Sequence, residues 1–425
     1  MSAAVPAGTN ASQGDAICID GERLLSKLSA LAEIGARADG SCCRLALTDE
    51  DRDGRDLVVQ WMKEAGMNIS IDPIGNVFGR RPGKNPALAP VMTGSHTDTV
   101  RTGGAYDGNL GVLGGLEVVA TLNQAGVQTE RDLVVGIFTN EEGARFAPDM
   151  LGSLVYVGGL PLQDALQTKS IDGALLGEEL QRIGYAGTDK LGLYRPHAFV
   201  ELHIEQGPVL DIEGTAIGAV QNLQGISWQE VTIVGQSNHA GTTPMRMRHD
   251  AGYVAGAIAT FVRELAKEMG GDQVGTVGKI DLTPNLINVI AARALVTVDL
   301  RNTDENLLQE AEARFAEFLQ EIAASEGVQI STRRLARFEP VLFDQTIVEI
   351  IEQQAQQLGL SCRRMTSGAG HDAQMLARIC RSAMIFVPSV GGISHNPAEH
   401  TEPADMVAGC NVLLHTLIRL LNQED

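Results

Sequence analysis

Two adjacent glutamates, Glu141 and Glu142, follow the apolar run DLVVGIF within the stretch TNEEGARF. Adjacent carboxylates repel each other, and neighbouring residues on a strand face opposite sides. The pair suits a metal site in which one carboxylate binds an ion and its neighbour stays free as a general base. The simpler interpretation is a solvated loop with two exposed acids, which the apolar run beside it disfavours.

Metal-binding residue types also follow three other short apolar runs. His96 and Asp98 follow APVMTG, His203 ends AFVEL, and His395 follows AMIFVP, while Asp107 precedes a helical pattern. Imidazole and carboxylate suit zinc, manganese, cobalt or nickel. Taken alone, each histidine is more simply structural, and Asp107 is more simply a helix cap. Five converging ligands are too many for one open catalytic zinc and favour two ions that share a bridging carboxylate.

The apolar runs are typical of buried parallel strands, which show little alternation. APVMTG, the helical pattern DGNLGVLGGLEVVATLNQAG and DLVVGIF predict a βαβ unit. In an open α/β sheet the carboxyl ends of parallel strands line one crevice, where ligands bind. The pattern therefore predicts that the histidines and carboxylates meet at one edge of a sheet.

The middle of the chain has a different pattern of predicted strands and helices, in the order β-α-β-β-α-β of a ferredoxin-like split unit. We therefore expect an α/β protein with a doubly wound, mainly parallel sheet and an inserted ferredoxin-like α+β domain for dimerisation or as a lid. The predicted divisions are a disordered N-terminal arm at residues 1–19, a catalytic domain at 20–216 and 337–425, and the insertion at 217–336.

Composition narrows the class of partner. The 425 residues carry 33 Lys and Arg against 53 Asp and Glu, a formal net charge of -20. This balance argues against nucleic acid or an anionic membrane as a partner. The 6 cysteines form no C-x-x-C pair, the N-terminus does not resemble a signal peptide, and no apolar run approaches membrane-spanning length, so we expect a cytoplasmic protein.

Nine motifs together resemble the dimetal aminoacylase/carboxypeptidase-like hydrolases: GSHTDTV, GAYDG, TNEEGARF, ELHIEQGPVL, SNHAGTTPMRMR, NLINVI, VDLRN, SGAGHDA and PSVGGISHNP. The chain is most similar to the amidase, hydantoinase and carbamoylase branch, which includes N-carbamoyl-L-amino-acid hydrolases, β-ureidopropionases and allantoate amidohydrolases. The resemblance extends from about residue 20 to residue 420.

The resemblance implies a role for each residue of the metal centre. One divalent ion would be held by His96, Asp107 and His203, and the other by Asp107, Glu142 and His395. Zinc or manganese is expected, with cobalt or nickel as alternatives. Glu141 would be the general base. Asp98 would orient the imidazole of His96 from behind.

The resemblance also implies residues that bind the substrate. His239, on the inserted domain, would stabilise the oxyanion in the site of a partner subunit, so a homodimer is expected. Asn288 and Arg301 would bind the substrate carboxylate, and a guanidinium suits this role because it can donate two hydrogen bonds to one carboxylate. Taken alone, Arg301 is more simply explained as part of a surface ion pair. His371 and Gln206 would also contact the substrate.

The expected activity is hydrolysis of a linear amide that is not a peptide bond, with an N-carbamoyl-L-amino acid as the first candidate substrate. Allantoate, N-carbamoyl-β-alanine and N-acyl-amino acids or dipeptides are alternatives, and a metal-free binding protein on the same fold is the alternative from another class. Thr97 and the pair Ala291 and Ala292 depart from the family pattern beside site residues, which leaves the substrate open.

Overall fold

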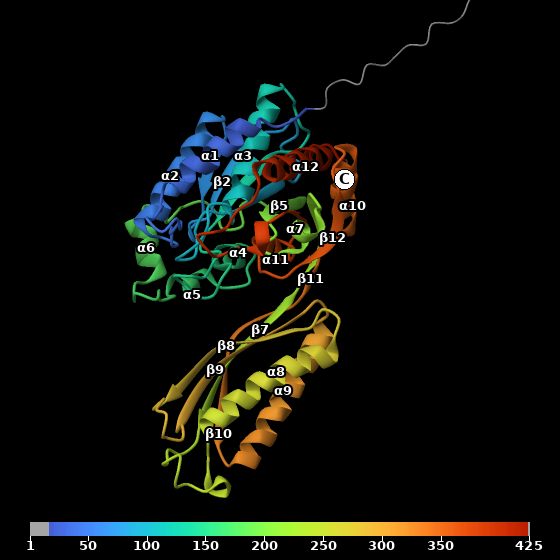
Figure 1. Cartoon of the computed structure of the whole chain (residues 1–425). Coiled ribbons are helices and arrows are strands. Elements are labelled where there is room, and N and C mark those ends of the chain that lie inside the picture. The colour runs from blue at the N-terminus through green and yellow to red at the C-terminus, as the bar shows by residue number, and fades with distance from the viewer. Residues whose placement is uncertain (1–16, 424–425) are drawn as a thin grey trace, which may run out of the picture.

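The computed structural model describes residues 17–423, which form a large domain with a smaller, elongated domain at one end (Figure 1). Most of the predicted disordered arm, residues 1–19, lies outside the described residues. Its last part differs from the prediction, because Ile17 and Ile19 pack against the core of the large domain. The Ile19 N–H also donates to Oδ1 of Asn411 over 3.0 Å. Residues 17–19 are therefore part of the large domain.

The large domain is built on a nine-stranded mixed sheet. Its four central strands all run parallel, in the order β4 (Leu133–Phe138), β3 (Val91–His96), β5 (Ala198–Ile204) and β13 (Arg381–Val387). The flanking strands are β2 (Val77–Arg81) and β1 (Asn68–Ile71) beyond β4, and β6 (Ile217–Leu223), β11 (Val341–Leu342) and β12 (Cys362–Ser367) beyond β13. The predicted βαβ unit is confirmed, because α3 (Asn109–Gln124) joins the parallel neighbours β3 and β4.

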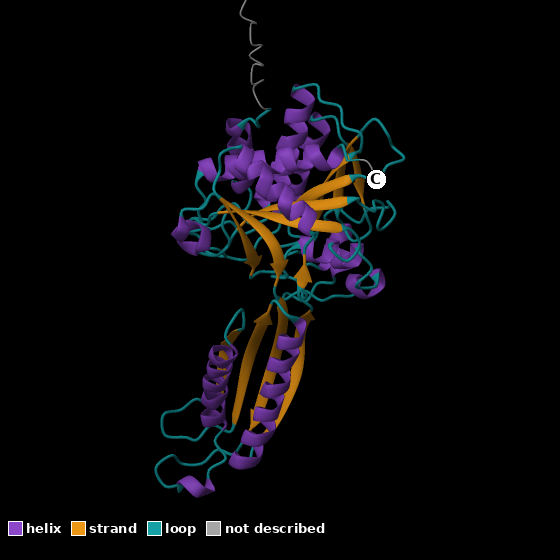
Figure 2. Cartoon of the chain, turned by 90° about the vertical axis from the view of Figure 1, so that its right-hand side faces the viewer, coloured by secondary structure: helices purple, strands orange, loops and turns teal. Residues whose placement is uncertain are grey.

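Helices cover both sides of this sheet (Figure 2). One layer contains α1 (Gly21–Ala32), α3, α12 (Pro403–Leu421) and α10 (Gln345–Gln357), each packed on the next, while α4 (Leu151–Tyr156) packs on α11 (Asp372–Leu376), which contacts β5 and β13. The remaining helices of the large domain are α2 (Asp49–Glu64), α5 (Leu162–Leu166), α6 (Leu176–Arg182), α7 (Val209–Glu213) and η2 (Val390–Gly392). The side chains of Asp20 and Thr48 cap α1 and α2.

Within the described part of the chain, α12 alone is long and apolar enough to cross a membrane by length and composition. The sequence-based expectation that no apolar run approaches this length was therefore wrong. The helix packs against α3, α10, β5 and β13 with ten buried residues, which is how a core helix of a large domain behaves.

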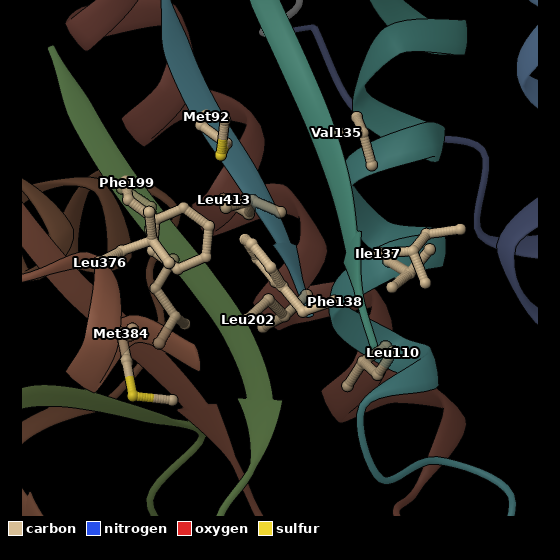
Figure 3. Close-up of a cluster of buried hydrophobic side chains, with 14 of the residues drawn as sticks. Met92, Leu110, Val135, Ile137, Phe138, Phe199, Leu202, Leu376, Met384 and Leu413 are labelled. Carbon is tan, nitrogen blue, oxygen red and sulfur yellow. The ribbon is translucent and has the colours of Figure 1, made fainter. Parts of the chain in front are cut away.

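The core surrounds the strands that carry the candidate site. Figure 3 shows Phe138 of β4, Phe199 and Leu202 of β5 and Leu413 of α12 in one cluster. Every residue of β3, β4 and β5 is buried. Each fully buried side chain of this size stabilises the fold by about 1.5–3 kcal/mol. The strand ends are therefore fixed by packing on both faces of the sheet.

The smaller domain has the predicted β-α-β-β-α-β order, made of β7 (Gly225–Val234), α8 (Ala251–Met269), β8 (Val274–Thr283), β9 (Arg293–Asn302), α9 (Glu305–Glu326) and β10 (Gln329–Phe338). Its antiparallel strands lie in the order β10-β7-β9-β8, the ferredoxin-like arrangement. The helices α8 and α9 cover one sheet face and enclose a second hydrophobic core. The short helix η1 (Met245–Met247) lies in the connection between β7 and α8.

The boundary of the inserted domain differs from the predicted residues 217–336. Strand β6, which begins at Ile217, pairs with β13 and β12 and therefore belongs to the large sheet. The chain crosses to the small sheet at Gln224, between β6 and β7. Strand β10 continues to Phe338, where it still pairs with Ile226 of β7. Two long strands, β7 and β10, thus lead to and from the small domain.

Candidate metal centre and substrate pocket

The predicted metal ligands meet at the carboxyl edge of the four parallel strands. His96 is the last residue of β3 and pairs with Phe138, the last residue of β4, just before the Glu141–Glu142 pair. His203 lies at the end of β5, beside Phe386 of β13. The sheet order β4-β3-β5-β13 therefore brings four strand ends to one place.

The ligands form two groups around Asp107. Its Oδ1 lies 3.5 Å from Nε2 of His96 and 3.1 Å from Nε2 of His203. Its Oδ2 lies 3.3 Å from Nε2 of His395, which is 3.2 Å from Oε2 of Glu142. In each group the candidate ligand atoms lie within 4.8 Å of one another. One carboxylate oxygen thus faces each group, as a bridging ligand requires.

The chemistry of the donor atoms fits two divalent ions. Nδ1 of His96 donates to the main-chain oxygen of Asp98 over 2.9 Å, and Nδ1 of His203 donates to that of Ile204 over 2.8 Å. These bonds turn the Nε2 lone pairs toward the site, as in metal-ligating histidines. Nε2 of His96 is buried and has no hydrogen-bond partner among residues 17–423. An ion would satisfy this atom.

The helix-cap interpretation of Asp107 does not hold. Helix α3 begins at Asn109, its N-cap is Gly108, and no side chain caps it. Gly108 has a positive φ of 66°, and a Cβ there would stand 2.5 Å from the imidazole of His96. Glycine at this position therefore lets Asp107 and His96 approach each other.

Glu141 lies beside the metal centre but outside both ligand groups. Its Oε2 is 3.4 Å from Nε2 of His96, and its side chain is buried. Burial raises the pKa of the Glu141 carboxyl well above its usual range, against the attraction of His96. A raised pKa brings a carboxylate closer to the proton affinity that a general base needs near neutral pH.

Asp98 orients His96 through its main-chain oxygen and not through its carboxylate. Its carboxylate stays 4.0 Å from Nδ1 of His96, and its main-chain oxygen takes the hydrogen bond instead. The carboxylate oxygens face the N–H groups of Glu141 and Glu142, each at 3.3 Å. Asp98 therefore positions His96 through its backbone and the glutamate pair through its side chain.

The metal centre forms the floor of a pocket of about 550 Å³ that is open to solvent. Gln206, His371 and Arg301 line this pocket, as their predicted contact with a substrate requires. Gln206 donates to Oδ2 of Asp107 over 2.8 Å. His371 is buried against the ring of His203, at 4.5 Å between centroids, and burial lowers its pKa well below the usual value. A neutral imidazole there would add no positive charge beside ions held by the two ligand groups.

Arg301 reaches the pocket from the small domain. Its guanidinium is held by Asp299, with Nη2 to Oδ2 at 2.9 Å, and by the main-chain oxygen of Gly368 in the large domain. A guanidinium has five N–H donors, so donors remain for a substrate carboxylate. The surface ion pair considered from the sequence does exist, but it also fixes Arg301 inside the pocket wall.

His239 and Asn288 lie elsewhere. The two segments are adjacent, because the Ala240 N–H donates to the Asn288 oxygen over 3.0 Å. Both lie beyond the end of the small sheet where Val234 pairs with Arg293, whereas Arg301 pairs with Ile226 at the other end. Eight residues of strand separate the two ends, or about 26 Å. Asn288 and Arg301 therefore cannot grip one carboxylate within a single chain.

Three residues of the site were not found by reasoning from the sequence. Glu399 is buried, and its carboxylate accepts from the N–H groups of Tyr106 and Asp107 and from Oγ of Ser394. Asp149 and Trp228 line the pocket. Glu399 lies four residues after His395 in the same loop, and Asp149 follows TNEEGARF closely, so proximity to the motifs was the available signal.

The chain is similar to known proteins over nearly its whole length. The profile of peptidase family M20/M25/M40 matches residues 92–419. The N-carbamoyl-L-amino-acid amidohydrolase of Rhizobium meliloti is 41% identical over 408 residues, covering 96% of this chain and 98% of that protein. The allantoate amidohydrolase of Bacillus subtilis is 35% identical over 395 residues, covering 92% of this chain and 95% of that protein.

Solved structures show the same fold over nearly the whole chain. An amidase of the hydantoinase/carbamoylase family from Burkholderia multivorans has a TM-score of 0.91 at 45% identity and covers 96% of this chain and 100% of its own. AtUAH in complex with glyoxylate has a TM-score of 0.84 at 34% identity, covering 95% of this chain and 98% of its own. The chain therefore belongs to peptidase family M20/M25/M40, in the hydantoinase/carbamoylase branch of amidohydrolases that cleave carbon–nitrogen bonds other than peptide bonds.

Proposed function

We propose that the protein hydrolyses N-carbamoyl-L-amino acids with two divalent metal ions, zinc or manganese in the first place and cobalt or nickel as alternatives. The observation that carries the metal-dependent part is Asp107, whose two oxygens face two separate ligand groups next to a buried Glu141. The N-carbamoyl-L-amino-acid amidohydrolase relative, at 41% identity, supports the choice of substrate.

In this proposal Glu141 moves the proton. Bound divalent ions polarise a carbonyl oxygen and lower the pKa of a coordinated water. The Glu141 carboxylate takes a proton from the attacking water, whose oxygen forms a bond to the carbamoyl carbon. When the bond from that carbon to the amino-acid nitrogen breaks, Glu141 returns the proton to the leaving amine. The products are the amino acid and carbamic acid, which decomposes to carbon dioxide and ammonia.

Arg301 and Gln206 orient the substrate in the pocket. Arg301 binds the carboxylate with the N–H donors that Asp299 and Gly368 leave free. The related AtUAH binds glyoxylate, a small carboxylate, in its crystal structure. Gln206, already within 2.8 Å of Asp107, would contact the carbamoyl end.

His239 and Asn288 act in the site of a second subunit. The strand end from which they extend lies about 26 Å along the small sheet from Arg301, which favours a partner chain's metal centre over their own. The outer face of the small sheet offers a surface for that partner, since β8 and most of β10 are exposed or half-exposed. This geometry supports the proposed homodimer, with His239 as oxyanion donor and Asn288 as substrate ligand.

Allantoate is the second candidate substrate, because the Bacillus subtilis allantoate amidohydrolase is 35% identical over nearly the same length. A cytoplasmic location is also part of the proposal, supported by six cysteines that form no disulfide in the structure.

A substrate panel tests the function. The purified protein is stripped of metal, loaded with manganese, zinc or cobalt, and assayed with N-carbamoyl-L-amino acids, N-carbamoyl-β-alanine, allantoate and N-acetyl-amino acids. We expect the highest kcat/KM for an N-carbamoyl-L-amino acid. Faster hydrolysis of allantoate would move the assignment to the second candidate. Equal activity with and without metal would exclude the dimetal mechanism.

A further inference from the structure

One carboxylate in the pocket has no part in the proposed reaction. Asp149 lines the cavity together with Arg301, Trp228 and Ile226, and it belongs to neither ligand group of the two ions. Its Oδ1 is buried and accepts no hydrogen bond from any residue between 17 and 423. An unpartnered buried acceptor is costly, so its retention at a pocket wall calls for a partner from outside the chain.

Asp149 is held rigidly on the loop that carries the base. The N–H groups of Met150, Leu151 and Gly152 donate to the main-chain oxygens of Glu141, Asn140 and Thr139. Nδ2 of Asn140 closes the loop by donating to the oxygens of Phe146 and Pro148. Asp149 is therefore fixed relative to Glu141 and not on a mobile surface loop.

A structural role does not account for the side chain. Helix α4 follows directly, but its N-cap is Met150, and no side chain makes a cap hydrogen bond. Arg301 faces the same cavity and attracts the Asp149 charge. Its guanidinium is hydrogen-bonded to Asp299 and to Gly368. Within residues 17–423, the structure shows no ion pair between Arg301 and Asp149. Burial raises the Asp149 pKa to about 6, so the carboxylate is charged at pH 7.5 and accepts hydrogen bonds strongly.

We propose that Asp149 is a specificity-determining residue that selects substrates whose side chain carries a hydrogen-bond donor, an ammonium or an amide N–H, in addition to the α-carboxylate bound by Arg301. The pocket would then bind the ligand at two points. Arg301 of the small domain would bind its carboxylate, and Asp149 of the large domain would accept a hydrogen bond from its donor group. The inference rests on the proposed function, because it names the substrate class of the same site.

Pairs of substrates that match in shape test this selection. N-α-carbamoyl-L-lysine is compared with N-carbamoyl-L-norleucine, and N-carbamoyl-L-asparagine with N-carbamoyl-L-leucine, using the manganese-loaded protein. The variants are Asp149→Leu, which removes the acceptor, and Asp149→Asn, which keeps one acceptor oxygen without the charge. Asp164→Asn, a change at an exposed acid of α5, is the control.

We expect the wild type and the Asp164→Asn control to prefer the donor-bearing member of each pair. In Asp149→Leu this ratio of kcat/KM should fall by about tenfold or more, since a hydrogen bond to a charged group is lost. Asp149→Asn should lose the preference for lysine and keep part of that for asparagine. Ratios that stay within twofold of the wild type in Asp149→Leu would overturn the inference.

A binding measurement separates this inference from the proposed function. Calorimetry with L-lysine and L-norleucine, the products of the first pair, needs no turnover. Weaker lysine binding to Asp149→Leu, with norleucine binding unchanged, supports the inference even if no carbamoyl compound is hydrolysed and the proposed function fails. Equal loss or no loss for both amino acids counts against it.

Discussion

At the scale of single residues, the site depends on the difference between Glu141 and Glu142. Glu142 faces His395 at 3.2 Å and belongs to a ligand group, whereas Glu141 lies 3.4 Å from His96 and outside both groups. The clash expected from two adjacent carboxylates is relieved because their side chains face different partners and because two cations would offset the charge.

Replacing Glu141 with Gln should abolish proton transfer and keep the metal centre. We expect kcat to fall by about 10²–10⁴-fold, the usual contribution of a general base, with close to two ions retained per chain. Activity assays and metal analysis on the same sample give both numbers. Glu178→Gln, at an exposed acid of α6, is the matched control. Near-normal turnover with metal bound would show that another group is the base.

Glu399 should raise metal affinity by holding the two loops that carry the candidate ligands Asp107 and His395. Its carboxylate accepts from the N–H of Asp107 at 3.3 Å and from Oγ of Ser394, the neighbour of His395, at 2.9 Å. Such supporting hydrogen bonds are typically worth 10–100-fold in affinity. Glu399→Ala should therefore weaken metal binding by about this factor, and excess metal should restore much of the activity.

Metal affinity is measured by titration for Glu399→Ala and for a control variant, Glu402→Gln, which changes an exposed acid nearby. The comparison separates the positioning role of Glu399 from general damage to the fold. Unchanged affinity in Glu399→Ala would contradict the positioning role. So would a loss of activity that excess metal leaves untouched.

The convergence of the candidate ligands could be predicted from the sequence, because parallel strands end at one edge of the sheet, but their division into two ligand sets and a base was implied by the family resemblance. The carboxylate role of Asp98 could not be predicted, since the choice between its main-chain and side-chain oxygens depends on how the Glu141 loop folds back. The separation of Asn288 from Arg301 was available from the sequence, because the extended stretch ALVTVDL lies between them.

At the scale of elements, periodicity predicted the βαβ unit and the ferredoxin-like insertion, but not the strand that joins them. Strand β6 is followed by β7 after only Gln224, so the sequence shows one long extended stretch without a turn signal. Its pairing with β13 and β12, which lie more than 130 residues later, assigns it to the large sheet. Long-range pairing of this kind leaves no local pattern.

Thr97, Ala291 and Ala292, the residues that depart from the family pattern, lie outside the pocket wall. Thr97 is buried after β3, where its main-chain oxygen accepts from Nε of Arg44 over 2.7 Å. The two alanines precede β9, at the far end of the small sheet. Neither position lines the pocket of its own chain.

The β1–β2 turn should make stability depend on pH through Asp72. Its carboxylate accepts from the N–H groups of Ile74 and Asn76, but burial raises its pKa to about 6, above the value of about 4 in an unfolded chain. A raised carboxyl pKa means that the unfolded state loses the proton first. Stability is therefore highest below pH 4 for this group and falls as pH rises to about 6, by roughly 3 kcal/mol.

Asp72→Asn removes this ionisation. The free energy of unfolding of Asp72→Asn minus that of the wild type should rise between pH 4 and pH 7 by up to roughly 3 kcal/mol, on top of any constant offset from the lost hydrogen bond. Urea unfolding at several pH values measures it. A difference that stays flat over this range would mean that Asp72 is charged in the folded protein throughout.

At the scale of the whole molecule, the small domain is elongated (Figure 1), and its candidate substrate-binding residues lie at its two ends. Arg301 lies at the near end, against Gly368 of its own large domain. The connection between β7 and α8, with His239, extends from the far end. A sheet of this length keeps the far end away from its own metal centre, so under the proposed function a complete site would draw on two chains.

Mixed dimers test this arrangement directly. A dimer of one Glu141→Gln chain and one His239→Ala chain contains a site with an intact Glu141 and the partner's intact His239, so it should show about half the wild-type activity per dimer. Each variant alone should be inactive or nearly so. Two different affinity tags allow the mixed dimer to be isolated and assayed. The matched control pairs Glu141→Gln with Arg301→Ala: because Arg301 lines the pocket of its own chain, no intact site forms and activity should stay low. If His239 acts within its own chain, the first mixed dimer will be as inactive as the control, and the placement of a complete site across two chains will be refuted.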